Sequence, residues 1–509
     1  MANYGFAIDL RKCIGCHACT IACKAEHEIP VGVNRCWVKT VEKGSFPETR
    51  RFFFPVLCNQ CTDAPCVRIC PTNALFKRRD GIVDLYGDSC IGCRACMEAC
   101  PYDQLFIDPN TRTAEKCNFC ANRVENQLLP ACVIVCPTEC RIFGDLDDPA
   151  SAVSRIVQHE AFTVRKPEKG TGPKIFYLGA DESAIRPEAA ARPLYYKEGQ
   201  VHLRPIGAPE ENPASPGDPR VDYDIPHAKP WGIDMVLYLF MKAVATGVML
   251  LAPLLWGLGE RRPIVSIVAP AVSLLFITLT TIVLIADLKR PERFYYILTR
   301  PNWRSWLVWG TWFLVAHGMI SAAWLVSGWM GWTGVISALC LPAMIVAALA
   351  TSYTGFLFAQ GLGRDLWQGP HAALDLIAQS GMAGAAALLL LIELTGVGSP
   401  PTSALLSLVL LLSVLAHITI LVFENLLAPS PTRHHELAVQ TIRRGAYARW
   451  FWVGAIAASA IAPVLLLAGG MFGGPGAAAL VTASSMLALA GGAAWDYIWV
   501  EAGQSVPLS

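Results

Sequence analysis

The sequence predicts a chain of two unlike parts, an α+β domain rich in cysteine followed by an all-α membrane bundle of eight transmembrane helices. Eighteen of the 19 cysteines stand before position 141, and long apolar runs take over from Trp231. Hydrophobic residues make up 53% of the 509 residues and charged residues 16%, a balance typical of membrane proteins. The formal net charge of +1 indicates no basic surface that would favour nucleic acid as a partner.

Shifts in composition divide the chain into three expected segments. Residues 1–190 are mixed in character and punctuated by turn residues, as expected of a folded α+β domain. Residues 191–230 include "GAPEENPASPGDPRVDYDIPHAKP" and are rich in proline, glycine and charge, which predicts an extended linker lying over a surface. Residues 231–500 form the expected membrane domain.

Eight apolar runs have the length of a membrane span. A helix of about 20 residues crosses roughly 30 Å of hydrocarbon and satisfies its own backbone polar groups. Buried helices of a soluble domain would not give eight such runs in succession. The expected spans are 233–258, 264–286, 305–327, 333–359, 371–395, 401–423, 446–468 and 475–500.

Charge in the connecting loops predicts the orientation in the membrane. Eight spans put both termini and the second, fourth and sixth loops on one side, and the positive-inside rule makes that side cytoplasmic. The first residues show no secretory signal, so we expect an inner-membrane protein with its cysteine-rich domain in the cytoplasm. A basic surface beneath a docked domain is an alternative reason for the same charges. These loops carry Lys289, Arg290, Arg293, Arg300, Arg304, Arg364, Arg433, Arg443 and Arg444, and the opposite loops carry Arg261 and Arg262.

The cysteines fall into four groups whose spacing predicts iron–sulfur clusters. "CIGCHAC" at Cys13 and "CIGCRAC" at Cys90 begin two C-x2-C-x2-C-x3-C runs 77 residues apart, which indicates an internally duplicated unit. This run is the bacterial ferredoxin pattern for [4Fe–4S] clusters, and sixteen cysteines suffice for four of them. Zinc sites of four thiolates also use C-x2-C, but they usually pair two separated C-x2-C knuckles. The groups are Cys13, Cys16, Cys19, Cys23; Cys58, Cys61, Cys66, Cys70; Cys90, Cys93, Cys96, Cys100; and Cys117, Cys120, Cys132, Cys136.

Residues 1 to about 180 resemble the four-cluster electron-transfer subunit of the molybdopterin oxidoreductases, such as dimethyl sulfoxide reductase and polysulfide reductase. All sixteen cysteine positions match that ferredoxin-like pattern. The resemblance implies that groups one and four interlock, as do groups two and three. The implied ligand sets are Cys13, Cys16, Cys19 with Cys136; Cys117, Cys120, Cys132 with Cys23; Cys58, Cys61, Cys66 with Cys100; and Cys90, Cys93, Cys96 with Cys70.

Three cysteines fall outside this pattern. We interpret Cys36 and Cys140 as buried thiols, with Cys140 a candidate for tuning a nearby cluster. Cys340 stands in an apolar run and is interpreted as helix packing.

Two stretches of the apolar half resemble the NrfD-type membrane subunit of polysulfide reductase. They are "DLKRPERFYYILTRPNWRSWLVWGTW" from Asp287 and "SYTGFLFAQGLGRDLWQ" from Ser352. The resemblance implies a quinone, menaquinone or ubiquinone, bound near the iron–sulfur side, and no haem. His317 lies near the middle of its expected span and His417 near the cytoplasmic end, an offset that argues against one haem between them.

Ionisable groups inside membrane spans are costly and therefore point to function. Quinone chemistry takes two electrons and two protons, so carboxylates and imidazoles near the last cluster suit proton transfer. We expect Asp234, Asp287, His317 and Asp375 to serve the quinone site or a proton path. Each has a structural alternative: an interfacial Asp234, an ion pair of Asp287 with Arg290, a hydrogen-bonded packing role for His317, and a cap or structural pair for Asp375.

The leading hypothesis is an electron-transfer and quinone-reactive subunit of a multi-subunit oxidoreductase, joining two modules that are separate chains in the resembling enzymes. It implies a large molybdopterin-type catalytic subunit, the quinone pool and membrane lipid as partners. One alternative is a redox-driven proton pump with Lys242, His317 and Glu393 as its route. Another is a membrane anchor from which electrons leave to a soluble carrier.

Overall fold

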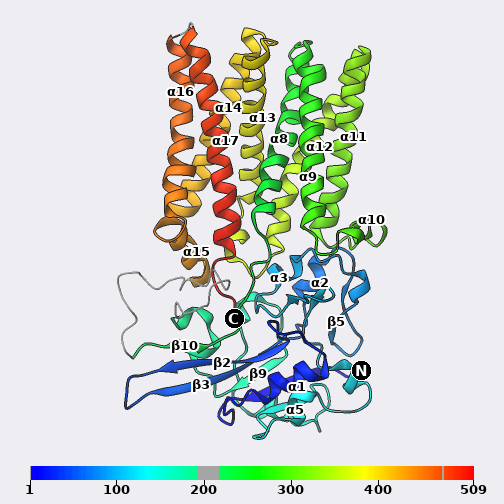
Figure 1. Cartoon of the computed structure of the whole chain (residues 1–509), viewed down its shortest axis with the longest axis vertical. Helices are drawn as coiled ribbons and strands as arrows, with labels where there is room; N and C mark the ends of the chain where they lie inside the picture. The colour runs from blue at the N-terminus through cyan, green and yellow to red at the C-terminus, as the bar shows by residue number, and fades with distance from the viewer. Residues whose placement is uncertain (1, 192–216, 473–474) are drawn as a thin grey trace.

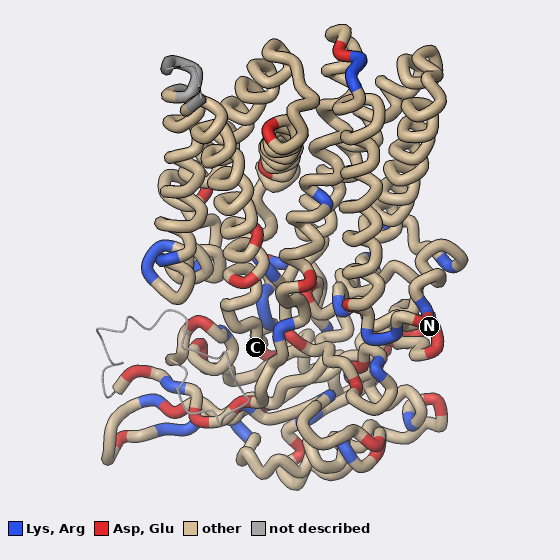
Figure 2. Tube along the Cα trace, turned by 45° about the horizontal axis from the view of Figure 1, so that its top comes forward, with Lys and Arg blue, Asp and Glu red and all other residues tan. Residues whose placement is uncertain are grey.

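The computed structural model describes residues 2–191, 217–472 and 475–509. Figure 1 shows an upright bundle of long helices standing on a smaller part made of short helices and small sheets. We call residues 2–191 the cysteine-rich part, and residues 231–472 with 475–509 the helical part. Figure 2 shows charged residues crowding the cysteine-rich part and the junction, while the long helices are nearly free of them.

In the described residues four small sheets form the framework of the cysteine-rich part, one of them completed by β10 from residues 217–230. In the first sheet β1 is central, antiparallel to β8 and parallel to β9, and in the second β2 lies between β10 and β3. Hairpins β4–β5 and β6–β7 complete the set. The strands are β1 (Tyr4–Asp9), β2 (Cys36–Lys43), β3 (Arg50–Leu57), β4 (Leu75–Lys77), β5 (Val83–Leu85), β6 (Phe106–Ile107), β7 (Ala114–Glu115), β8 (Arg141–Asp145), β9 (Ile175–Leu178) and β10 (Arg220–Tyr223).

Strand β1 forms because its apolar residues can be buried on both faces. Phe6 and Ile8 pack into a core that also contains cysteines, whereas Ala7 faces the opposite way against Val153 and Leu178. A strand covered on both faces is typically a continuous apolar run, as here. The loop that begins at Cys13 therefore follows directly on a buried strand.

Short helices connect these strands and carry many of the cysteines. Figure 1 shows α2 and α3 beside the bundle, with α1 and α5 at the end remote from it. The helices are α1 (Ala18–Glu26), α2 (Pro65–Ile69), α3 (Ala95–Ala99), α4 (Ala121–Val124), α5 (Ala131–Ile134), α6 (Ala152–His159) and α7 (Glu182–Ile185).

The helical part contains, in its described residues, seven helices long and apolar enough to cross a membrane. Each of the seven begins within one residue of an expected span, and the count of eight is not reached. Over the remaining expected span, 446–468, lies a shorter apolar helix, Trp450–Leu466, whose first two turns are π-helical. The helices are α8 (Ile233–Gly257), α9 (Ala269–Asp287), α10 (Tyr296–Thr299), α11 (Trp306–Met330), α12 (Thr333–Ala359), α13 (Ala372–Thr395), α14 (Pro400–Val422), α15 (Arg433–Arg443), α16 (Ala458–Phe472) and α17 (Pro475–Gly503).

Helices α8 and α13 form the centre of the bundle because small residues let their backbones approach. A Cβ added to Gly247 would lie 1.9 Å from the Ser380 carbonyl oxygen, and one on Gly384 would collide with the backbone of Gly247. Such close packing of small residues supplies van der Waals contact between helices that lipid surrounds. These two helices are accordingly the most buried of the seven.

Residues 217–230 run along the cysteine-rich part and enter the bundle. Strand β10 pairs with β2, and Asp224 accepts a hydrogen bond of 2.8 Å from the buried Trp37 indole. His227 Nδ1 lies 2.8 Å from Asp103, and Lys229 pairs with Glu501 at 2.5 Å. This stretch of the expected linker is thus firmly bound to both parts, while residues 192–216 of it lie outside the described residues.

Three segments of the helical part grip the cysteine-rich part: residues 288–305, residues 360–371 and the end of the chain. At the centre, Arg364 donates to Glu98 at 2.6 Å, and both side chains are buried. The same guanidinium donates to the carbonyls of Gln504 and Val506. Because Glu98 belongs to α3, this buried pair joins a cysteine helix to the base of the bundle.

Breaking this pair should destabilise the whole chain. Glu98→Ala leaves the Arg364 guanidinium buried without its carboxylate, which typically costs about 3–5 kcal/mol in the free energy of unfolding. Asp63→Ala is the matched control, because it removes the partner of Arg68 from a pair whose side chains are 63% and 52% exposed. An exposed pair contributes roughly 0–1 kcal/mol. Denaturant or thermal unfolding of the purified protein in detergent measures both losses, and equal losses would contradict the role given to the buried pair.

Candidate metal-cluster sites and their junction with the bundle

The duplicated cysteine loops share one backbone conformation. Gly15 and His17 have φ of 68° and 58°, and the residues 77 positions later, Gly92 and Arg94, have φ of 68° and 62°. Left-handed residues in such a turn direct successive backbone N–H groups into one concavity, an arrangement common at anionic and iron–sulfur sites. The other two groups have a left-handed residue at the corresponding place, Gln60 and Phe119.

Cys70, Cys90, Cys93 and Cys96 line a single cavity next to the bundle. Backbone N–H groups of Gly92 and Ala114 each donate to Cys90 Sγ at 3.4 Å, and that of Leu75 donates to Cys70 Sγ at 3.5 Å. Donors of this kind stabilise thiolates and the clusters that they ligate. The four cysteines are the set that the resemblance implied for one cluster, and we call them the proximal set.

Cys13, Cys16, Cys19 and Cys136 line a second cavity at the opposite end of the cysteine-rich part. Cys140 and Arg141 share its wall, and Cys136 Sγ lies 3.5 Å from Cys140 Sγ. Cys16 is exposed, unlike the cysteines of the proximal set. We call these four cysteines the distal set, and they too match an implied ligand set.

The remaining eight cysteines form two groups, which can be recognised by the neighbouring thiols that affect the pKa of each. Burial and the neighbouring Cys58 raise the pKa of Cys61 to about 12 and that of Cys100 to about 11. Burial also raises the pKa of Cys23, with Cys117, Cys132 and Cys120 as the neighbouring charges. Cys58, Cys61, Cys66 and Cys100 therefore lie together, and so do Cys23, Cys117, Cys120 and Cys132.

The four sets follow one another in a row. Cys66 is among the neighbours that raise the pKa of Cys96 in the proximal set. Cys58 raises the pKa of Cys117, and Cys19 of the distal set raises the pKa of Cys132. Each set thus has a neighbour in the next, from the bundle to the remote end.

All-thiolate donor sets with backbone N–H groups around them suit [4Fe–4S] clusters. Among the described residues, no group of three or more His, Cys, Asp or Glu side chains is close enough to hold a single metal ion. The sulfurs of the proximal and distal sets are instead spread over the walls of their cavities.

The proximal set is held directly against the helix ends. Asn302 Nδ2 donates to the Cys70 carbonyl at 2.8 Å, and Ser305 Oγ to the Ile69 carbonyl at 2.6 Å. Arg293 donates to the Cys90 carbonyl at 3.1 Å, and Trp231 Nε1 to the Cys93 carbonyl at 3.3 Å. Trp231 in turn packs on Trp367 and Phe358, with ring centroids 5.6 and 5.1 Å away.

Of the four residues singled out for quinone or proton chemistry, Asp375 lies in a buried polar network. Its Oδ1 is 2.6 Å from His417 Nδ1, and its Oδ2 accepts from Gln379 at 2.8 Å and from Trp495 Nε1 at 3.1 Å. His417 Nε2 is buried without a hydrogen-bond partner among the described groups. A carboxylate and an imidazole in contact, with one free ring nitrogen, can accept and return a proton.

The other three candidates lie elsewhere. Asp287 pairs with Arg94, not with Arg290, and so ties α9 to a cysteine loop. His317 is hydrogen-bonded to Ser273 at 2.9 Å inside the bundle. Asp234 is exposed in the first turn of α8. The structure thus brings Asp375 and Asp287 close to the junction and separates them from His317.

Lys242, singled out from the sequence for a proton route, has polar partners that were not, and the same is true of Asp375. Lys242 donates to the Thr351 carbonyl at 3.3 Å and to Thr354, which also shares a hydrogen bond of 2.8 Å with Tyr238. Gln379 could have been found, because it follows Asp375 by four residues and so lies on the same helix face. Trp495 and Thr354 could not, because no local pattern relates them to their partners.

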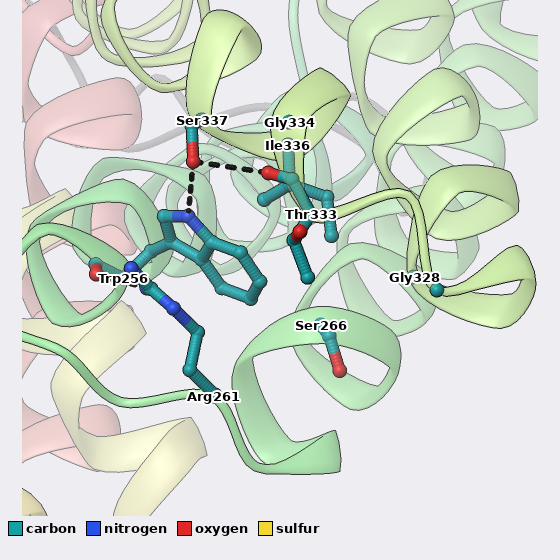
Figure 3. Close-up of a pocket in the computed structure, with 9 residues that line it drawn as sticks. Trp256, Arg261, Ser266, Gly328, Thr333, Gly334, Ile336 and Ser337 are labelled. Atoms are coloured by element: carbon teal, nitrogen blue, oxygen red, sulfur yellow. Dashed lines mark hydrogen bonds between the residues drawn. The ribbon is translucent and has the colours of Figure 1, made fainter.

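A larger open cavity lies at the other end of the bundle, remote from the sulfurs (Figure 3). The indole of Trp256 donates to Ser337 at 3.0 Å, and the Arg261 guanidinium stacks 3.9 Å from the Trp256 ring centre. Gly328, Thr333, Gly334 and Ile336 complete much of the wall. The cavity is separated from the proximal set by the length of α8, roughly 37 Å for 25 residues at 1.5 Å each.

Comparison with known proteins agrees with both parts. Residues 224–507 match the family described as polysulphide reductase, NrfD, and residues 49–146 match a 4Fe-4S dicluster domain. The sequence is 44% identical over 201 residues to the B subunit of tetrathionate reductase from Salmonella typhimurium, and the match covers 38% of this chain and 80% of that protein. It is 41% identical over 179 residues to the B polypeptide of polysulfide reductase from Wolinella succinogenes, covering 35% and 94% of the two proteins.

A third relative is a putative dimethyl sulfoxide reductase iron-sulfur subunit of Halobacterium salinarum, 38% identical over 219 residues that cover 37% of this chain and 83% of that protein. Both resemblances expected from the sequence are therefore confirmed: a 4Fe-4S domain and an NrfD-type domain are joined in one polypeptide. The NrfD match and the seven apolar helices identify a multi-pass membrane protein.

Proposed function

This chain is a member of the polysulphide reductase NrfD family, and from that premise we propose that it is the electron-transfer and quinone-reactive membrane subunit of a multi-subunit oxidoreductase. Sixteen of its 19 cysteines would hold four [4Fe–4S] clusters in the sets described above. Bound there, such clusters each hold and pass one electron. The observation that carries the proposal is the row of four thiolate sets that ends against the base of the bundle.

The quinone end of the row would lie at the first turn of α13. Asp375, paired with His417 and fixed by Gln379 and Trp495, is held ready to exchange a proton with a quinone. Arg364 and Trp231 connect the adjoining loops to the proximal set, so electrons and protons would meet within one small region. The substrate is menaquinone or ubiquinone, whose reduction takes two electrons and two protons.

Haem has no part in this proposal. His317 contacts Ser273 of α9 and His417 contacts Asp375 of α13, so the two histidines lie in different polar surroundings instead of facing one another as a haem pair would. We also propose an eighth span over residues 446–468, supported by the way in which α16 packs against α14 and α17 (Figure 1).

Anaerobically purified, reduced protein should contain about sixteen irons per chain with cubane resonances, and a quinone analogue should reoxidise it. Asp375→Asn should slow reoxidation by roughly 10²-fold or more, because general acid–base groups typically contribute that much. Glu393→Gln is the control: this exposed residue lies at the other end of the same helix. Stopped-flow recovery of the cluster absorbance on reoxidation measures the rates.

The same experiment separates the alternatives. Clusters that the quinone analogue leaves reduced would contradict the proposal and favour a membrane anchor with a soluble electron acceptor. A proton pump with Lys242, His317 and Glu393 predicts unchanged reoxidation but lower proton release in Glu393→Gln. The three residues have different polar surroundings: Lys242 contacts Thr351 and Thr354, His317 contacts Ser273, and Glu393 is exposed.

A large molybdopterin-type catalytic subunit would dock on an apolar patch around the distal set. In the second copy of the duplicated motif, Ile91 is 1% exposed because it packs under Ile297 and Val308 of the helical part. Its equivalent in the first copy, Ile14, is 58% exposed, and Ile21, the equivalent of the buried Glu98, is 64% exposed. The patch consists of Ile14, Ile21, Leu128, Leu129, Ile134 and Val135.

Charge placed in this patch should release the partner. The double variant Ile21→Asp/Ile134→Asp should keep its iron content but lose copurification with the proposed catalytic subunit, because an aspartate would be buried without a counter-charge. Phe162→Asp, at an exposed apolar position of the cysteine-rich part outside the patch, should retain the partner. Retention by the double variant would contradict this docking surface.

We place the cysteine-rich part on the cytoplasmic side of the inner membrane. Arg290, Arg293, Arg300 and Arg364 bond to the cysteine-rich part, so their charge has a docking role. Lys289, Arg304, Arg433, Arg443 and Arg444 still exceed Arg261 and Arg262 on the opposite side, which supports this orientation.

A labelling experiment tests the orientation. In intact cells, a membrane-impermeant maleimide should label Arg262→Cys, on the far side of the bundle, and should label Glu48→Cys only after lysis. Both positions are exposed, Arg262 in the loop between α8 and α9 and Glu48 in the turn between β2 and β3. The unsubstituted protein controls for its own cysteines. The reverse pattern would place the cysteine-rich part outside the cytoplasm.

A further inference from the structure

Arg141 is a buried cation beside the distal set. It is the first residue of β8, paired with Ile8 of β1, and is 2% exposed. Its Nη2 donates to Cys36 Sγ at 3.1 Å, while its Nε and Nη1 are buried without a hydrogen-bond partner among the described groups. Arg141 also lines the cavity of the distal set.

The charge of Arg141 acts on two neighbouring sets. Arg141 lines one cavity with Cys13 and Cys19 of the distal set, and its side chain also interacts with Cys132, which belongs to the next set in the row. Cys36 and Cys140, which the implied ligand sets do not use, are further neighbours. The guanidinium therefore lies between two cluster sites.

Nothing acidic balances this cation within the part of the chain that the structure describes: no Asp or Glu oxygen lies within 4.0 Å of it. Other buried arginines are satisfied differently, since Arg364 pairs with Glu98, and Arg165 contacts the Tyr102 ring and two backbone carbonyls. A guanidinium stays protonated in proteins, and a buried charge without a partner is strongly destabilising. Arg141 is accordingly built to face anions, and the two thiolate-ligated clusters are anions of the required kind.

We propose that Arg141 is a fixed cation that raises the reduction potentials of the two clusters remote from the membrane. This rests on the proposed function, because it requires clusters in the distal set and in the set of Cys23, Cys117, Cys120 and Cys132. Reduction adds one electron to a cluster that is already negative, so a nearby cation stabilises the reduced form. The transfer moves one electron from the neighbouring cluster, makes or breaks no bond and leaves Arg141 protonated.

The consequence is that the energy of an electron differs along the row of clusters. Electrons that enter beside the bundle are stabilised at the remote end, where the catalytic subunit would dock. Cys36 holds the guanidinium in place as a sulfur acceptor, which gives this extra thiol a role distinct from ligation.

Redox titration followed by electron paramagnetic resonance tests the proposal on the full-length protein. In Arg141→Gln, two of the four midpoint potentials should fall while the other two stay in place. Arg141→Lys keeps the charge and should hold the same two midpoints closer to those of the parent. Arg165→Gln, which removes another buried arginine of the cysteine-rich part, should leave these two midpoints unchanged.

A second route neutralises the cation without removing it. Cys36→Asp would place a carboxylate beside Arg141 Nη2 and should also lower the two midpoints, whereas the uncharged Cys36→Asn should lower them less. This pair decides the matter if Arg141→Gln fails to take up iron. Unchanged midpoints in Arg141→Gln, or in Cys36→Asp, would overturn the proposal, as would an equal fall of all four. Absence of cubane signals from the parent protein would instead refute the proposed function.

Discussion

The structure depends on one constraint: the loop that carries Cys90, Cys93 and Cys96 must lie directly against the ends of membrane helices. Backbone carbonyls of this loop and of Cys70 accept hydrogen bonds from Arg293, Trp231 and Asn302. Hydrogen bonds to carbonyls hold a backbone at a fixed distance regardless of its side chains. The helical part therefore positions the cysteine backbone itself and leaves the sulfurs free to line their cavity.

The buried charges at this junction contribute more to the specific geometry of the interface than to its net stability. A buried ion pair such as Arg364 with Glu98 recovers little net energy, because both ions lose their hydration. Its geometry is nevertheless demanding, since one guanidinium contacts a carboxylate of α3 and two carbonyls near the end of the chain. Arginines that a topology rule would assign to the cytoplasmic membrane surface are in this way part of an interface between two domains.

Local sequence patterns predicted the features that depend on residue spacing. They missed the contacts between residues that are far apart in the sequence and meet only in the fold. The cysteine groups and seven apolar spans could be placed closely because their signals lie within a few residues of sequence. The partner of Asp287 is 193 residues away in Arg94, and that of Asp375 is 42 residues away in His417. Arg141 belongs to no sequence motif. Only its burial, with two of its own nitrogens lacking a hydrogen-bond partner among the described groups, distinguishes it in the structure. Over 446–468 the described apolar helix, Trp450–Leu466, is shorter than the other seven.

The internal duplication shows how the two ends of the row of cysteine sets differ. Both copies of the motif use the same left-handed turns, so both form the same kind of sulfur loop. In the second copy, Ile91, Arg94 and Glu98 face the helical part and are covered by it. In the first copy the equivalent face, with Ile14, His17 and Ile21, is turned toward solvent, and the additional cation is Arg141, on the inner side of the loop. A duplicated unit with one covered face and one open apolar face suits the docking surface proposed above, and the buried cation lies beside the set at the open end.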